Sequence, residues 1–465
     1  MTTDSDIAQD LASLEVYDPR NGSLVGALEE ATPEEVGAAV AAAKAAQPHW
    51  AATDAAARGE LLEAAASALQ EHAGELAEMN ARETGRPEHE AREGVMAGAG
   101  TLRQYAQLGP VHRGRSLRGG QLAVDYTVNE PRGVAVVLTP WNDPVAVAAG
   151  LLGAALATGN TVLHKPSERC PHLGELLGRI LSDVLPPRVM NTLTGGPAVG
   201  AALACHQDVD VIAHVGSSLT GARIAQAAAL TGAHVIRENG GNDPLIVDNG
   251  VDPAWAAEQA AIGAFTNSGQ ICTSVERIYV HRAVAGLFGE ALAAEARRRN
   301  KGGGIAPLVD RRLRDNVHAQ VSEALSLGAA AAEGGAVPEG PGAHYPATVL
   351  MDCHGQMAVM QEETFGPVAP VQLVDSFDDG LRLASEGRYG LAATVLTADM
   401  DHAHRAVAAL QVGTVKVNAV FGGAPGGSAQ PRRDSGAGFG YGPELLDEFT
   451  TVKVVHMGLP GGARL

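Results

Sequence analysis

The sequence predicts an α/β fold in which helices alternate with the strands of parallel sheets. From about residue 132 to 239, short apolar runs of strand length alternate with runs that carry apolar residues at helical spacing. A second alternating region extends from 244 to about 415. Short apolar strands separated by helices are typical of βαβ units and hence of parallel sheets. A chain of 465 residues is too long for one ordinary core, so we expect two or three domains.

The elements follow one another in a regular order. The first 120 residues are mainly helical, with apolar residues at helical spacing in 34–46 and 60–80. The strands expected next are 132–140, 160–166, 188–195, 210–216 and 233–239, and the helices between them are 144–159, 174–185, 201–207 and 218–230. Further strands are expected at 277–281, 347–350 and 392–397, and the Gly- and Pro-rich segments 302–307 and 422–431 are expected to be loops.

Composition indicates a well-packed globular protein and excludes several classes of partner. Hydrophobic residues make up 45% of the chain, and 34 basic against 53 acidic side chains give a formal charge of −19. Such a field repels nucleic acid and anionic membranes, so we expect neither as a partner.

Three further expectations concern location, disulfides and metals. The N-terminus is acidic and lacks the pattern of a signal peptide, and the longest apolar run, 144–157, is too short to cross a bilayer, so we expect a cytoplasmic protein. The four cysteines are widely separated and form no CxxC pair, and the sixteen histidines contain no HExxH. We therefore expect neither a disulfide framework nor a metal site.

Three loops lie where a parallel sheet binds ligands, beyond the carboxyl ends of strands. They are TPWNDP at 139–144, HKPSE at 164–168 and HVGSSLTG at 214–221. In the last, Gly216 ends a strand and Ser217 opens a helix, so an anion such as a pyrophosphate fits there. Taken alone the motif is weak, because many strand-to-helix turns use Gly and Ser for helix capping only. In HKPSE, Glu168 could accept the two hydroxyls of an adenosine ribose.

Six motifs in one order carry a family resemblance. PWN at 140–142, KPSE at 165–168, GS at 216–217, Glu-x-Gly-Gly at 238–241, NSGQIC at 267–272 and EETFGPV at 362–368 span some 230 residues. The series closely resembles the NAD(P)-dependent aldehyde dehydrogenase family. Agreement extends to GTVKVN at 413–418 and to the SGAG and FTTVKVV segments near the C-terminus.

The resemblance assigns the catalytic roles, and the chemistry supports them. A thiolate attacks a carbonyl carbon well, which makes Cys272 the nucleophile, and the oxygen that gains negative charge needs hydrogen-bond donors. The family supplies them from the side chain corresponding to Asn142 and from the backbone N–H of Cys272. Glu238 resembles the base that activates water to hydrolyse the thioester. Its presence disfavours the branch of the family that transfers the acyl group to coenzyme A.

The cofactor residues also follow from the resemblance. Lys165 and Glu168 are assigned to the adenosine ribose, Ser217 to the pyrophosphate, and Glu363 with Phe365 to the nicotinamide ribose. Because a carboxylate at Glu168 repels a 2′-phosphate, NAD is expected to be preferred over NADP. The expected cofactor set is completed by Trp141, Ser167, Gly216 and Gly240.

Several positions depart from the family pattern. Asp143 stands where an aromatic residue often lines the substrate tunnel, and ENGGND at 238–243 replaces the common ELGGK. AQPRRD at 429–434 replaces a lysine-bearing FGGxK and places Arg433 at the lysine position. The segment 301–310 is shorter than is usual in the family. With Thr266, Ile271 and Thr273, Asp143 is expected to line a pocket for a small polar aldehyde, hydroxylated or amine-bearing. Alternatively, Asp143 turns away and caps the helix that follows it.

The family fold sets the expected architecture. It combines a Rossmann-like cofactor domain (1–112 and 132–238), an α/β catalytic domain (239–448) and a small oligomerisation strand element (113–131 and 449–465). That element builds dimers or tetramers in the family, so a homodimer or homotetramer is expected. The alternatives are a coenzyme A-dependent acylating enzyme and a non-catalytic binding protein whose ENGGND and AQPRRD segments have removed the activity.

Overall fold

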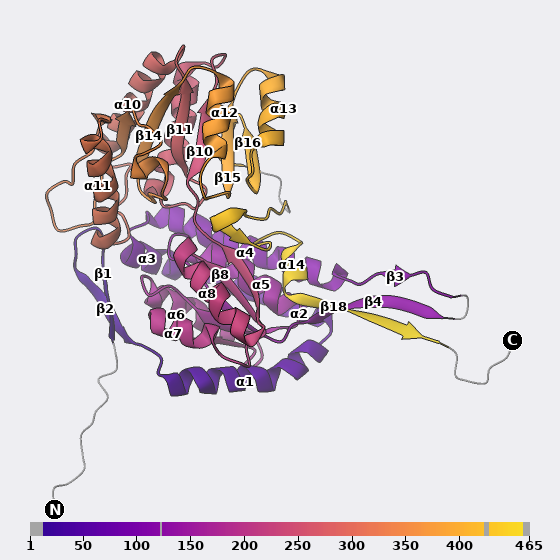
Figure 1. Ribbon diagram of the computed structural model, residues 1–465. Helices are drawn as coiled ribbons and strands as arrows, with labels where there is room; N and C mark the ends of the chain where they lie inside the picture. Colours follow the sequence, from indigo (N-terminus) through magenta and orange to yellow (C-terminus); the bar gives the residue numbers. More distant parts are fainter. Residues whose placement is uncertain (1–12, 121–122, 423–426, 459–465) are drawn as a thin grey trace, which may run out of the picture.

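Two parallel sheets with helices on both faces form the body of the molecule (Figure 1). The computed structural model describes residues 13–120, 123–422 and 427–458. Parts of the predicted segments 1–112, 113–131, 422–431 and 449–465 therefore lie outside the described residues. The predicted α/β class is confirmed.

The first sheet has the strand order β17-β9-β8-β5-β6-β7, and only β17 runs antiparallel to its neighbour. Along β5, alternate side chains point to opposite faces. Val134, Val136 and Leu138 pack with the side that carries α1, α7 and α8, whereas Ala135 and Val137 pack with α2, α4, α5 and α6. The bounds are β5 Val134–Leu138, β6 Thr161–Lys165, β7 Met190–Thr192, β8 Val211–Val215, β9 His234–Glu238, β17 Gly436–Ala437, α1 Pro33–Ala52, α2 Ala55–Glu71, α3 Ala73–Thr84, α4 Glu88–Leu108, α5 Pro144–Ala157, α6 Pro171–Ser182, α7 Pro197–Ala204 and α8 Ser218–Thr231.

The second sheet has the order β12-β13-β14-β11-β10-β15-β16, with β12 antiparallel at one edge. Helices α9 and α10 cover one face, and α11, α12 and α13 cover the other. The bounds are β10 Asp243–Val247, β11 Val275–His281, β12 Ala330–Glu333, β13 Thr348–Met351, β14 Val368–Val374, β15 Ala392–Leu396, β16 Thr414–Val417, α9 Pro253–Phe265, α10 Ala285–Lys301, α11 Arg311–Ser326, α12 Phe377–Ser385 and α13 Met400–Ala409.

A three-stranded antiparallel sheet, β18-β4-β3, projects from the body (Figure 1). Strand β18 (Thr450–Met457) pairs with β4 (Val124–Pro131) along its whole length, and β3 is Ser116–Leu117. A hairpin of β1 (Ser13–Tyr17) and β2 (Leu24–Glu29) precedes α1, and the four-residue α14 (Leu445–Glu448) precedes β18. In the part of the chain that the structure describes, no helix is long and apolar enough to cross a membrane.

The predicted strands and helices of the first sheet lie where the sequence places them. The apolar run 60–80 forms two helices instead of one, because the chain turns at His72 between α2 and α3. The strands predicted at 277–281, 347–350 and 392–397 also form and belong to the second sheet.

Candidate active site

A tight turn after α9 positions Cys272. Asn267 and Ser268 adopt left-handed backbone conformations with φ of 49° and 56°, and Gly269 follows with φ of 75°. A Cβ on Gly269 would lie 2.1 Å from the carbonyl oxygen of Gly366. Left-handed conformations at non-glycine residues are strained and persist only where the surroundings enforce them. The turn is therefore held in a fixed shape directly before the cysteine.

Side-chain hydrogen bonds lock this turn. The Gln270 amide nitrogen donates to the carbonyl of Asn267 at 3.0 Å, and its oxygen accepts from the backbone N–H of Val309 at 2.9 Å. The hydroxyl of Ser268 donates to the carbonyl of Ala306 at 2.7 Å. Because Gln270 is buried, both halves of its amide are used within the fold, which fixes the backbone that leads into Cys272.

Asn142 joins the cysteine loop from the other sheet. Its Nδ2 donates to the carbonyl of Gln270 at 3.0 Å, and Asn267 Nδ2 donates to the carbonyl of Asn142 at 3.3 Å. A side-chain amide has two N–H donors, so one remains for a ligand. The fold thus brings together two predicted site segments that lie about 130 residues apart in sequence.

Glu238 lies half-buried at the carboxyl end of β9. Burial raises its pKa from 4.5 to about 8, and the backbone N–H of Gly440 opposes this shift. Among the described residues, its buried Oε1 has no hydrogen-bond partner. Without a side chain at Gly440 the carboxyl has room, since a Cβ there would lie 2.0 Å from Glu238 Cγ. A carboxyl poised near neutral pH suits a general base.

The Cys272 thiol lies within electrostatic range of several ionisable groups. Burial and, to a smaller extent, the negative charges of Glu238, Asp243 and Glu363 raise its pKa from 9.0 to about 12, and the positive charge of Lys416 opposes this shift. The cysteine is therefore a thiol at neutral pH before anything binds. Forming the thiolate requires a base or a nearby positive charge.

The predicted cofactor residues at the first sheet lie at strand ends. Lys165 Nζ donates to the carbonyl of Pro166 at 2.9 Å and lies 3.8 Å from the Glu168 carboxylate, which is 37% exposed. Ser217 Oγ accepts from the backbone N–H of Thr220 at 3.3 Å. Ser217 therefore caps α8, as the helix-capping interpretation of this motif expects.

Two observations at the start of α8 fit a phosphate-bearing cofactor as well. The Ser218 hydroxyl is buried there without a partner among the described residues. The first backbone N–H groups of a helix also favour an anion. Gly216, whose N–H donates to the carbonyl of Glu238 at 3.1 Å, connects this end of the helix to the predicted base.

Four of the predicted cofactor residues, Trp141, Gly240, Glu363 and Phe365, form one cluster. Trp141 meets Phe365 edge to face with ring centroids 5.6 Å apart, and the Phe365 backbone has a φ of 52°. Glu363 accepts from the backbone N–H of Gly241 at 3.2 Å, and a Cβ on Gly240 would lie 2.2 Å from its carboxylate. Gly240 therefore leaves the space that Glu363 occupies.

Buried Glu276, which sequence reasoning missed, supports this cluster. Its carboxylate accepts from the backbone N–H groups of Thr364 and Phe365 at 2.9 and 2.8 Å and from the Asn242 side chain at 3.2 Å. These bonds hold the left-handed turn that presents Glu363 and Phe365. A lone glutamate directly before the predicted strand 277–281 gave no signal of this role.

Asp143 does not cap its helix, so that alternative is wrong. Its side chain makes no capping hydrogen bond to α5; instead, Oδ1 lies 2.9 Å from Nη1 of Arg86. The same Arg86 nitrogen donates to the carbonyl of Asn142 at 3.2 Å. Burial raises the pKa of Asp143 and the charge of Arg86 lowers it. Arg86, in the loop between α3 and α4, thus links the unusual aspartate to the backbone of the predicted oxyanion donor.

The other predicted pocket residues flank the cysteine loop. The Thr266 hydroxyl is exposed and donates to the carbonyl of Ile262 at 2.7 Å, so it completes the end of α9. Ile271 and Thr273 are half-buried on either side of Cys272. Whether these three residues contact substrate stays a prediction.

Comparison with known proteins decides the family. The model of the aldehyde dehydrogenase family matches residues 7–455. The chain belongs to this family. A betaine aldehyde dehydrogenase of Cereibacter sphaeroides is 35% identical over 96% of this chain and 94% of its own length, and a peroxisomal aminoaldehyde dehydrogenase 2 of Pisum sativum is 35% identical over 95% and 91%. The resemblance inferred from the six motifs is confirmed.

Solved structures of aldehyde dehydrogenases share the fold. PnpE in complex with nicotinamide adenine dinucleotide has a TM-score of 0.93 at 30% identity and covers 98% of this chain and 95% of its own. An NAD+ complex of aldehyde dehydrogenase from Bacillus cereus has a TM-score of 0.93 at 31% identity, with 97% and 94% covered. The protein is thus an oxidoreductase of aldehydes, and these NAD complexes support NAD as its cofactor.

The two segments that depart from the family pattern contact each other. In this aldehyde dehydrogenase, Asn239 Nδ2 donates to the carbonyl of Asp434 at 3.0 Å, and the Ser435 hydroxyl donates to the carbonyl of Gly240 at 2.8 Å. Strand β17 then pairs with β9 through Gly436 and Glu238. The altered ENGGND and AQPRRD segments therefore hold the loop that carries the predicted base.

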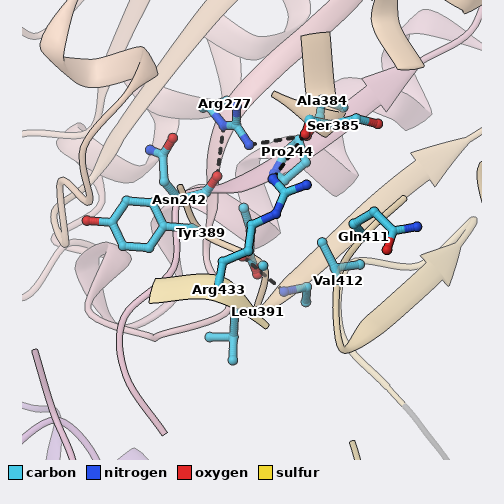
Figure 2. A pocket seen from close by; sticks show the side chains of 13 residues that line it. Asn242, Pro244, Arg277, Ala384, Ser385, Tyr389, Leu391, Gln411, Val412 and Arg433 are labelled. Carbon is cyan, nitrogen blue, oxygen red and sulfur yellow. Dashed lines mark hydrogen bonds between the residues drawn. The ribbon is translucent and has the colours of Figure 1, made fainter. Parts of the chain in front are cut away.

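Figure 2 shows the cavity between these segments. Its volume of about 10 Å³ is that of roughly one water molecule. Arg433 occupies its rim and donates to the carbonyls of Ser385 and Gly387 at 3.1 and 2.8 Å, while Arg277 donates to the carbonyl of Asn242 at 2.8 Å (Figure 2). The space is too small for an aldehyde, and its arginines are bonded to backbone. Arg433 thus ties the AQPRRD segment to the backbone of residues 385–387.

Proposed function

We propose that this protein is a hydrolytic, NAD-preferring aldehyde dehydrogenase that acts through a thiohemiacetal and a thioester on Cys272. The observation that carries the proposal is the junction of the cysteine loop with Asn142, with Glu238 within electrostatic range of the sulfur. Nucleophile, oxyanion donor and base then converge on one reacting carbonyl.

Each site residue has a separate proposed role in the reaction. Cys272 Sγ gives its proton to solvent water and forms a bond to the carbonyl carbon, and the free N–H of Asn142 with the backbone N–H of Cys272 holds the resulting oxyanion. The C=O bond then re-forms as hydride leaves the carbon, which gives the thioester. NAD, when bound, supplies the hydride acceptor. Glu238 then takes a proton from water, which attacks the thioester and releases the acid while Cys272 regains its proton. Trp141, Ser167, Gly216, Ser217, Gly240, Glu363 and Phe365 are proposed to bind the cofactor with Lys165 and Glu168.

The preference for NAD rests on Glu168. Its carboxylate is partly exposed and, among the described residues, forms a single long ion pair of 3.8 Å with Lys165, so its charge is not fully compensated. A ribose with two hydroxyls can donate to this carboxylate, whereas a 2′-phosphate meets repulsion.

The substrate is proposed to be small and polar. The polar pair of Arg86 and Asp143 stands where an aromatic side chain would otherwise make the tunnel apolar. The names of the relatives above, for betaine aldehyde and for aminoaldehydes, agree with a polar substrate.

The proposal also includes domains, assembly and location. The first sheet, apart from β17, comes from the proposed NAD-binding segments, and the second comes from the proposed catalytic segment. The outer edge of β18 exposes Val452 and Val454, which are 67% and 66% accessible. A long apolar edge strand invites pairing with another copy, so we propose a homodimer or homotetramer, located in the cytoplasm.

NADH formation across short aliphatic, aromatic, hydroxylated and amino-aldehydes tests the function, with Cys272→Ala as the control. Turnover by the parent protein and none by the variant is expected. Dependence on coenzyme A would instead support the acylating alternative, and NAD binding without any turnover would support the non-catalytic one.

A further inference from the structure

Lys416 is a cation beside the nucleophile for which no role has been assigned. It lies on β16, the edge strand of the second sheet, opposite Thr394. Its face of the strand is shared with Thr414, to which the Tyr441 hydroxyl bonds. Tyr441 and Lys416 both lie within electrostatic range of Cys272. The charge of Lys416 therefore acts on the reacting centre.

A backbone carbonyl and an aromatic ring hold the Lys416 ammonium in place. Nζ donates to the carbonyl of Val420 at 2.8 Å and lies 5.4 Å from the centre of the Phe421 ring. Within the described ranges, it forms no ion pair at 4.0 Å or less. The carboxyl with the largest effect on it, Asp243, is fully buried, and burial raises the pKa of that carboxyl to about 8. Burial lowers the pKa of Lys416 itself, and the charges of Asp243 and Cys272 oppose that shift.

We infer that Lys416 determines substrate specificity and that the substrate is an aldehyde carrying a carboxylate a few carbons from its carbonyl. This inference rests on the proposed function, because it places the aldehyde carbon at Cys272. A half-buried ammonium with spare N–H donors binds a carboxylate through charge-assisted hydrogen bonds. The Val420 carbonyl uses only one of the three N–H groups.

The same geometry disfavours a cationic aldehyde. The aromatic face of Phe421, which could attract a substrate ammonium, already carries the Lys416 ammonium. Asp143, the other group that could attract a cation, is paired with Arg86 at 2.9 Å. A substrate cation would therefore meet repulsion from Lys416 and no free carboxylate from Asp143.

The experiment compares kcat/KM for succinic semialdehyde, butanal and trimethylaminobutyraldehyde, which share a chain length and differ in charge. The proteins are the parent, Lys416→Met, Lys416→Arg and Lys44→Met. Lys44 is exposed on α1 and ion-paired with Asp208, so its replacement removes the same charge far from the site. Thermal melting and NAD binding confirm that each variant is folded.

The expected result is a preference of the parent and of Lys44→Met for succinic semialdehyde. Lys416→Met should lose about tenfold or more on that substrate with butanal nearly unchanged, and Lys416→Arg should retain the preference. An equal loss on all three aldehydes would overturn the inference, since Lys416 would then act on the thiolate. A parent that prefers the neutral or the cationic aldehyde would also overturn it.

A binding measurement separates this inference from the proposed function. Succinate should slow the alkylation of Cys272 in the parent more than butanol does, and this protection should vanish in Lys416→Met. Protection without any aldehyde turnover would refute the proposed oxidation and leave the carboxylate site standing. Absence of protection would refute the carboxylate site even if aldehydes are oxidised.

Discussion

Replacing Glu238 with glutamine should stop turnover after acylation while leaving the first chemical step intact. The amide keeps the shape of the side chain but cannot take a proton from water. If Glu238 serves the hydrolysis of the thioester, each subunit should still form about one NADH rapidly and then turn over about 10²- to 10⁴-fold more slowly.

The structure sets the pH dependence of this effect. With a pKa of about 8, Glu238 is ionised to about one tenth at pH 7 and about nine tenths at pH 9. Turnover of the parent limited by hydrolysis should therefore rise nearly tenfold over this interval, while that of Glu238→Gln stays flat.

Stability gives an independent check of the raised pKa. The folded protein binds the Glu238 proton more tightly than the unfolded chain, so stability is lost as pH rises from 4.5 through about 8. Glu238→Gln has no carboxyl to ionise and therefore does not lose this stability. Relative to the parent, its free energy of unfolding should gain several kcal/mol between pH 5 and pH 9, with about 5 kcal/mol as the upper limit.

Stopped-flow absorbance of NADH measures the burst and the steady state, and thermal melting across pH measures the stability. A Glu238→Gln enzyme that turns over at the parental rate with the same pH profile would show that the base lies elsewhere. A variant without a burst would instead assign Glu238 to the acylation step.

Three further changes test other parts of the site. Arg86→Gln should lower kcat about tenfold to a hundredfold with the Kd for NAD unchanged, because Asn142 and Asp143 both lose their contact with the guanidinium. NAD binding that weakens in parallel, measured by calorimetry, would contradict this local role. Glu168→Gln should raise the ratio of kcat/KM for NADP to that for NAD about tenfold, and an unchanged ratio in steady-state assays would remove Glu168 from cofactor selection. Val454→Glu on the exposed edge of β18 should reduce the mass measured by light scattering to that of a smaller assembly; a parental mass would place the interface elsewhere.

The sequence was most informative where a local motif and a strand end coincide. NSGQIC marks the nucleophile loop in the sequence, and the structure places it on a tight turn with φ values of 49° to 75° at Asn267, Ser268 and Gly269. The βαβ alternation likewise predicts both parallel sheets, because buried parallel strands are apolar throughout.

Long-range partners left no such signal. Arg86 lies 56 residues before Asn142, and Lys416 approaches Cys272 only after the edge strand joins the second sheet. Buried Glu276 supports Phe365 from a strand whose sequence gives no motif. Such contacts depend on how the elements pack, and pattern within a segment does not contain that information.

The central claim is that the acyl group is carried by Cys272, and mass spectrometry of the trapped enzyme tests it most directly. Glu238→Gln mixed with NAD and an oxidisable aldehyde, quenched in acid and digested, should carry the acyl mass on the peptide that contains Cys272. NADH formation with no adduct, or with the adduct on Cys170, Cys205 or Cys353, would contradict the account.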